Sequence, residues 1–162
     1  MSEIIEEMER YLEAQECAFQ VNEEKTWVSF GFDAANIRWR SVAGEDDNGR
    51  FVSLSFLPLV VPVDRRMALA ELITRINYGL GLGHFILDLD DGDLRFMVTV
   101  PLGGVALSQE VIAEVMGAHQ ALVDTFLPAI GRVLFSSTPP QLALQSDGTV
   151  QLKGAGERFS LN

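Results

Sequence analysis

The sequence has a single cysteine, Cys17, and only two histidines among its 162 residues. One cysteine excludes an internal disulfide framework and is typical of a protein that stays in a reducing compartment. Two histidines far apart in the sequence, with one cysteine, do not supply the ligand set of a zinc site. We therefore expect neither a disulfide nor a bound metal.

Long apolar runs and basic clusters are also missing. No run approaches the ~20 apolar residues that a membrane span needs, and the acidic N-terminal residues do not resemble a signal peptide. The chain has 12 basic against 23 acidic residues, a formal net charge of −11. Such a surface repels phosphate backbones and anionic lipid. We expect a cytoplasmic protein with no nucleic-acid partner and no membrane partner.

Apolar residues make up 48% of the chain, which suits one packed domain of this length. Apolar residues at helical spacing and alternating apolar residues divide the chain into helices and strands. Helices are predicted near residues 3–12, 67–80 and 109–134, and strands near 19–21, 27–32, 37–42, 50–63, 85–90 and 93–100. Ser2, Asp64 and Ser108 are the predicted N-caps. Pro128 is expected to kink or restart the last helix, and Pro58 and Pro62 are expected to end their strand early or to mark a sheet edge.

The stretch from residue 67 to 104 carries the strongest local signals. After the helix and its terminating glycines, Asp91-Gly92 predicts a two-residue type I′ turn, because such turns need positive φ at both central positions. This turn would place Leu87 opposite Phe96 and Asp88 opposite Arg95. Leu89 would then share the core face of the hairpin.

The predicted order is helix, four strands, helix, two strands, helix. Hairpins rather than alternating strand and helix units indicate an α+β protein with an antiparallel sheet and helices on one face. We expect a single domain over residues 1–138. Residues 139–162 would form a C-terminal tail, in which Asp147-Gly148 predicts a weak hairpin.

Residues 2–135 resemble the YbjN-type proteins, which share the type III secretion chaperone-like fold. The resemblance rests on the acidic first helix, on Ile76-Asn77 near the end of the middle helix, and on the run G-x-F-x-L-D-x-x-x-G-x-L from Gly83 to Leu94. It implies a dimeric, non-catalytic protein that binds a peptide or another protein. It carries over no catalytic residue.

Residues with reactive or ligating side chains do not form a recognisable site. The aspartates around Gly92 fail the EF-hand pattern, which needs glycine at position 6 and glutamate at position 12. No nucleophile, base and orienting group can be assembled, so we expect neither an enzyme nor a cofactor. His119 lies on the apolar stripe of the last helix, where a hydrogen-bonded histidine in the core or at an interface is expected.

We therefore predict a chaperone- or adaptor-like binding module that acts as a homodimer with a protein or peptide client. The predicted client-binding face is the side of the sheet away from the helices, with Trp27, Trp39, Ile86 and Met97. A second candidate contact, for a dimer or a partner, is the last helix with Met116, His119 and Phe126. The acidic surface favours neutral or basic clients. The alternative is a regulatory or sensory domain that binds a small molecule.

Overall fold

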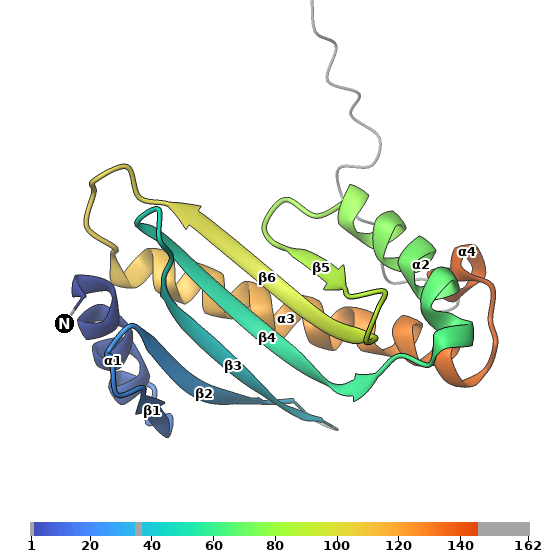
Figure 1. Cartoon of the computed structure of the whole chain (residues 1–162), viewed down its shortest axis with the longest axis horizontal. Coiled ribbons are helices and arrows are strands. Elements are labelled where there is room, and N and C mark those ends of the chain that lie inside the picture. Colours follow the sequence, from blue (N-terminus) through green and yellow to red (C-terminus); the bar gives the residue numbers. More distant parts are fainter. Residues whose placement is uncertain (1, 35–36, 146–162) are drawn as a thin grey trace, which may run out of the picture.

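The computed structural model describes residues 2–34 and 37–145, and it contains one six-stranded antiparallel sheet with helices against one face (Figure 1). The elements are α1 (Glu3–Ala14), β1 (Phe19–Val21), β2 (Trp27–Asp33), β3 (Arg38–Glu45), β4 (Arg50–Val60), the 3₁₀ turn η1 (Val63–Arg65), α2 (Arg66–Tyr78), β5 (His84–Leu87), β6 (Asp93–Pro101), α3 (Gln109–Phe135) and α4 (Pro140–Ala143). The predicted α+β class and the order of the main elements are confirmed.

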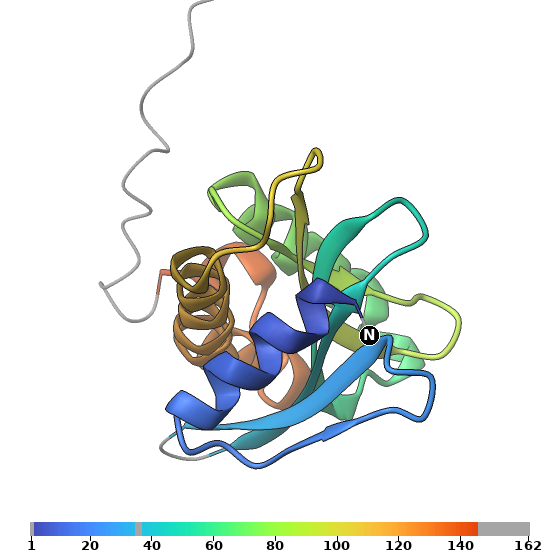
Figure 2. The ribbon, with the colours of Figure 1, turned by 90° about the vertical axis from the view of Figure 1, so that its left-hand side faces the viewer.

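The strands lie in the order β1-β2-β3-β4-β6-β5, so the short strands β1 and β5 form the two edges. Side chains alternate between two faces along each strand. The core face is covered by α1 and α3, which lie on one side of the sheet (Figure 2). We call the other side the open face. Strand register places on it Gln20, Trp27, Ser29, Gly31, Asp33, Arg38, Arg40, Val42, Gly44, Val52, Leu54, Phe56, His84, Ile86, Asp93, Arg95, Met97 and Thr99.

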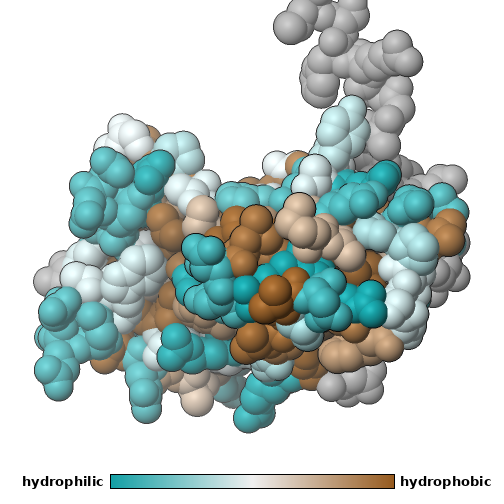
Figure 3. Space-filling model, turned by 45° about the vertical axis from the view of Figure 1, so that its right-hand side comes forward, coloured by the Kyte–Doolittle hydropathy of each residue, from teal (hydrophilic) through white to brown (hydrophobic). Residues whose placement is uncertain are grey.

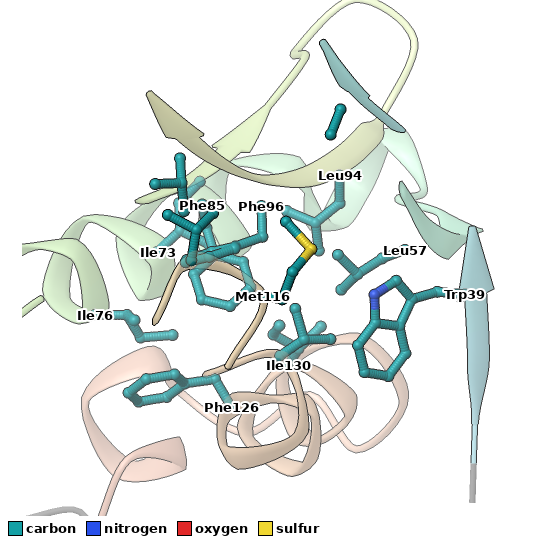
Figure 4. Packing of buried hydrophobic residues seen from close by; sticks show 14 of the residues in the cluster. Trp39, Leu57, Ile73, Ile76, Phe85, Leu94, Phe96, Met116, Phe126 and Ile130 are labelled. Atoms are coloured by element: carbon teal, nitrogen blue, oxygen red, sulfur yellow. The ribbon is translucent and has the colours of Figure 1, made fainter. Parts of the chain in front are cut away.

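The long helix α3 packs its apolar stripe against the core face. Met116, Phe126 and Ile130 of α3 point into the same cluster as Trp39 and Leu57 of the sheet (Figure 4). The predicted cap is confirmed, because the Ser108 hydroxyl accepts a hydrogen bond from the Val111 backbone N–H. Pro128 lies inside this helix without interrupting it, so the predicted restart does not occur. Ser2 caps α1 in the same way as Ser108 caps α3.

Helix α2 begins differently from the prediction but is fastened firmly at its end. The 3₁₀ turn η1 precedes it, and Asp64 makes no capping hydrogen bond. In the last turn, the Asn77 amide donates to the Phe85 carbonyl oxygen at 2.9 Å and accepts from the Phe85 N–H at 2.8 Å. Asn77 thus occupies the outer hydrogen-bonding groups of Phe85. At this position the edge of β5 is closed to a further strand.

The β5–β6 hairpin has a longer loop than the two-residue turn that the sequence predicted. Its closing pair is Asp88 and Asp93, and Leu87 lies opposite Leu94, two residues out of the predicted register. A shift of two keeps every side chain on its predicted face within the strands. Leu89 falls in the loop and is 50% exposed, which corrects its predicted core position. Arg95 pairs with Asp93 instead of Asp88.

Strand β4 lies between β3 and β6, so the predicted edge position is wrong. The strand runs through Pro58 and ends at Val60, before Pro62. Its pairing with β6 is irregular between Phe56 and Val60. Because the pairing is irregular there, the missing N–H of Pro58 does not interrupt a regular row of hydrogen bonds between β4 and β6.

The packed domain extends past residue 138. Pro140 and Ala143 of α4 are buried, and the Arg132 guanidinium donates to the Ala143 carbonyl oxygen at 2.6 Å. These contacts attach the short helix to the end of α3. The hairpin predicted around Asp147-Gly148 lies outside the described residues.

Candidate binding face

The open face of the sheet carries three of the four residues predicted to contact a client. Trp27, Ile86 and Met97 lie on it and are partly buried. Leu54 lies opposite Met97 and Val42 opposite Leu54, so apolar side chains cross the centre of the sheet in one row. Figure 3 shows hydrophobic residues interspersed with hydrophilic ones on this side of the molecule. No helix among residues 2–34 and 37–145 covers this row.

Trp39 does not lie on the open face, and this prediction is wrong. Its side chain is 2% exposed on the core face, and its indole N–H donates to the Ser55 hydroxyl at 3.0 Å. The alternation of Arg38, Trp39 and Arg40 could have shown this, since two exposed arginines flank an inward position.

The three residues predicted on the last helix as a dimer or partner contact are also buried. Met116, His119 and Phe126 are all at most 3% exposed, because they face the sheet. The prediction assumed that the apolar stripe of α3 exceeds what the sheet can cover. In the structure this helix runs along the sheet (Figure 1), and α1, α2 and α4 also pack against it.

His119 is the centre of a buried polar network between α3 and the sheet. One ring nitrogen, Nε2, lies 2.7 Å from the Ser53 hydroxyl, and the other, Nδ1, lies 2.7 Å from the Ser55 hydroxyl. Ser55 also contacts the Ser41 hydroxyl at 2.8 Å. The expected hydrogen-bonded core histidine is confirmed.

The surroundings of His119 hold it in the neutral form. Phe32 and Phe96 lie against the imidazole, with ring centroids 6.2 and 5.0 Å away. Burial lowers the pKa of His119 from its usual 6.5 to about 3. Desolvation disfavours the imidazolium, and within the described residues no carboxylate is paired with it to offset that cost. A serine beside a histidine resembles part of a hydrolase site, but here both are closed off in the core. The network therefore joins α3 to the sheet inside the core.

The feature that the sequence reading missed is an aromatic–arginine row on the open face. Phe56 lies opposite Arg40 on one side and Arg95 on the other. Both guanidinium carbons stand over its ring, 4.8 and 4.9 Å from the centroid. Such cation–π contacts hold the two arginines in place on the surface. The sequence alone can place Arg40, Phe56 and Arg95 on the outward side of their strands, but only the register between the strands shows that they are neighbours.

Beside this row the surface is hollowed, and Gly31, which has no side chain, is one of the lining residues. The hollow has a volume of about 590 Å³ and opens onto solvent. We call it the Gly31 hollow; its open-face lining is Gln20, Ser29, Gly31, Arg38, Arg40, Phe56 and Pro58. A cavity of this size is in the range of small-ligand sites. It combines an aromatic ring, hydroxyl and amide groups and the guanidinium groups of Arg38 and Arg40.

Other kinds of site find little support in the described residues. They contain no group of three or more His, Cys, Asp or Glu side chains that could hold a metal ion. In the same part of the chain, no helix is both long enough and apolar enough to cross a membrane.

These features define an α+β protein with a partly apolar open sheet face. Residues 5–132 match the YbjN family, which is described as "Putative bacterial sensory transduction regulator". The chain belongs to the YbjN family, which confirms the resemblance seen in the sequence. No curated protein matches it.

One similar solved structure is the Yersinia pestis type III secretion chaperone SycH in complex with a stable fragment of YscM2. The two chains are 14% identical, the match covers 75% of this chain and 95% of that chain, and the TM-score is 0.46.

Proposed function

We propose that this protein is a non-catalytic, chaperone- or adaptor-like module that binds an extended segment of a protein or peptide client on the open face of its sheet, and that it acts as a homodimer. The observation that carries the proposal is the open face itself. It offers a row of partly buried apolar side chains across the strands. Methionine and aromatic residues of this kind are enriched where proteins bind one another.

The two edges of the sheet are poorly suited to bind an added strand, which favours the open face as the binding surface. At β5 the Asn77 amide occupies the outward N–H and carbonyl of Phe85. The other edge, β1, has only three residues. Strand addition needs a longer row of free backbone groups than either edge offers. A client therefore contacts side chains more than backbone.

The first test is a charge in the apolar row. We expect Met97→Asp to weaken client binding at least about tenfold, because the carboxylate stays hydrated in the free protein and loses water in the complex. The measurement selects peptides from a random phage-displayed library with the wild-type protein and compares dissociation constants by fluorescence anisotropy.

The matched control is Phe135→Asp, which places the same charge on an exposed aromatic position at the end of α3. It should leave affinity unchanged, and both variants should keep the wild-type unfolding midpoint. Equal affinity of Met97→Asp and wild type would exclude the open face as the binding surface.

The homodimer rests on exposed apolar residues at one end of the molecule, where η1 leads into α2. Val63, the first residue of η1, is 76% exposed, and Met67, in the first turn of α2, is 71% exposed. Exposed apolar clusters of this kind often mark contacts between subunits. We expect light scattering at micromolar concentration to give the dimer mass, and Val63→Glu with Met67→Glu to give the monomer mass. A monomer mass for the wild type would remove the dimer from the proposal.

A second candidate function is a regulatory or sensory domain that binds a small molecule. The volume and mixed lining of the Gly31 hollow favour it, and so does the description of the family. A small metabolite that raises the melting temperature at micromolar concentration, while no selected peptide binds, would favour this candidate over the first.

A further inference from the structure

Arg40 differs from every other arginine in the described part of the chain. The others donate to a carboxylate, a hydroxyl or a backbone carbonyl oxygen. Arg40 has no such acceptor among residues 2–34 and 37–145, where its guanidinium stands over the Phe56 ring instead. A guanidinium has five N–H donors in a planar fork that matches a carboxylate. Arg40 is thus an exposed guanidinium that an aromatic ring holds in place, and it has no protein acceptor among the described residues.

Arg40 carries the net positive charge in the middle of the open face, because the charged residues around it are paired with one another. Arg38 is paired with Asp33, and its hydrogen bond lowers the pKa of that carboxyl below the usual value. Arg95 is paired with Asp93. Both pairs are close to neutral as units. The positive charge of Arg40 stands out on a protein whose formal net charge is −11.

The Gly31 hollow lies directly beside this guanidinium. Arg40 and Gly31 are opposite one another in the β2–β3 register, and Phe56 follows on β4. A Cβ placed on Gly31 would meet nothing closer than the Trp39 carbonyl oxygen at 3.7 Å, so the space above it is free. A side chain that enters the hollow comes within reach of Arg40.

The geometry points to the Gly31 hollow as the place where an acidic side chain, aspartate or glutamate, of an extended polypeptide client docks, with Arg40 as its partner. This inference rests on the proposed function and gives the chemistry of the client. It also reverses the expectation drawn from the net charge, which favoured neutral or basic segments. The charge of Arg40 decides which client side chain pairs with it, because at ~0.15 M salt the electrostatic effect of the more distant acidic residues is screened over about 8 Å.

The test uses three fluorescein-labelled peptides of about 11 residues, which in extended form cross the sheet. Each has leucine at alternate positions and serine between them, and the central leucine is replaced by Glu, Gln or Lys. We expect the Glu peptide to bind the full-length protein about fivefold more tightly than the Gln peptide, and the Lys peptide to bind least. The net charge alone predicts the opposite order of Glu and Lys.

Arg40→Gln should remove the difference between the Glu and Gln peptides and leave the affinity for the Gln peptide unchanged. Arg75→Gln is the matched control: it changes the net charge equally, but Arg75 lies on α2 and pairs with Glu71. It should keep the wild-type preference. Gly31→Val should occupy the part of the hollow opposite Arg40 and weaken binding of the Glu peptide without lowering the unfolding midpoint, because a strand accommodates valine.

The outcomes separate this inference from the function on which it rests. Equal binding of all three peptides, lowered by Met97→Asp but not by Arg40→Gln, would overturn the inference and leave open-face binding standing. Binding of none of them, together with failure of the library selection, would remove both. Displacement of the Glu peptide by N-acetylglutamate at equal concentration would assign the hollow to a small carboxylate, and would overturn the polypeptide as its occupant.

Discussion

Replacing Gly92 by valine should destabilise the protein by about 3–5 kcal/mol, one of the largest effects of a single substitution outside the core. Gly92 has a φ of +81°, which a β-branched residue resists. A Cβ there would also lie 2.3 Å from the Val61 carbonyl oxygen. Because the Val61 N–H donates to the Gly92 carbonyl oxygen at 2.9 Å, the hairpin loop and the end of β4 would have to separate. Chemical denaturation with a linear fit measures the loss.

Substitutions at two other glycines distinguish the cost of a positive φ from the cost of a steric clash. Gly103 has a φ of +59°, and a Cβ added to it would have no neighbour within 4 Å, so Gly103→Ala should cost only about 1 kcal/mol. Gly81 has neither a positive φ nor a close neighbour, so Gly81→Ala should be neutral or slightly stabilising. A loss for Gly92→Val no greater than that for Gly103→Ala would show that the contact with Val61 does not constrain the loop.

The sequence predicted the fold well because its signals are local. The alternation of apolar residues in β2 and β6, like the apolar stripe of α3, indicates which side chains face the core. The side that each strand and helix turns to the core then fixes how they pack together. The turn around Gly92 shows the limit of such signals. Asp91-Gly92 correctly marked a residue with positive φ, but Asp88 instead of Asp90 opens the loop, and its carboxylate accepts the Asp90 N–H at 2.8 Å. The hydrogen bond from the Asp90 N–H to the Asp88 side chain stabilises the longer loop, and the Asp-Gly pattern alone does not predict this bond.

The binding face was harder to predict than the fold, because it depends on which strands are neighbours. The row of Arg40, Phe56 and Arg95 exists only once β4 lies between β3 and β6. Sequence order places β5 before β6, and nothing local indicates that β6 inserts beside β4. Trp39 was misplaced because tryptophan is enriched at interfaces, whereas its position in the alternation of β3 places it in the core.

The stability of the protein should fall as the pH falls below about 6.5, and His119 should account for that loss. The unfolded chain takes up a proton on this residue near pH 6.5, whereas the folded protein does so only near pH 3. Between these values the unfolded state binds more protons, so the free energy of unfolding decreases with falling pH. The slope is about 1.4 kcal/mol per pH unit, and the loss between pH 6.5 and 5 is about 2 kcal/mol.

The window from pH 6.5 to 5 isolates the histidine, because most carboxyl groups titrate below it. His119→Gln keeps an amide donor and acceptor for Ser53 and Ser55 but cannot take up a proton. It should be less stable than wild type at pH 7, owing to lost packing against Phe96, and it should show a nearly flat profile down to pH 5. His84→Gln removes the other histidine, which is partly exposed on β5, and should keep the wild-type slope. Urea denaturation at each half pH unit measures the three profiles. Parallel profiles for wild type and His119→Gln would mean that another group drives the acid sensitivity, and that the buried network tolerates the imidazolium.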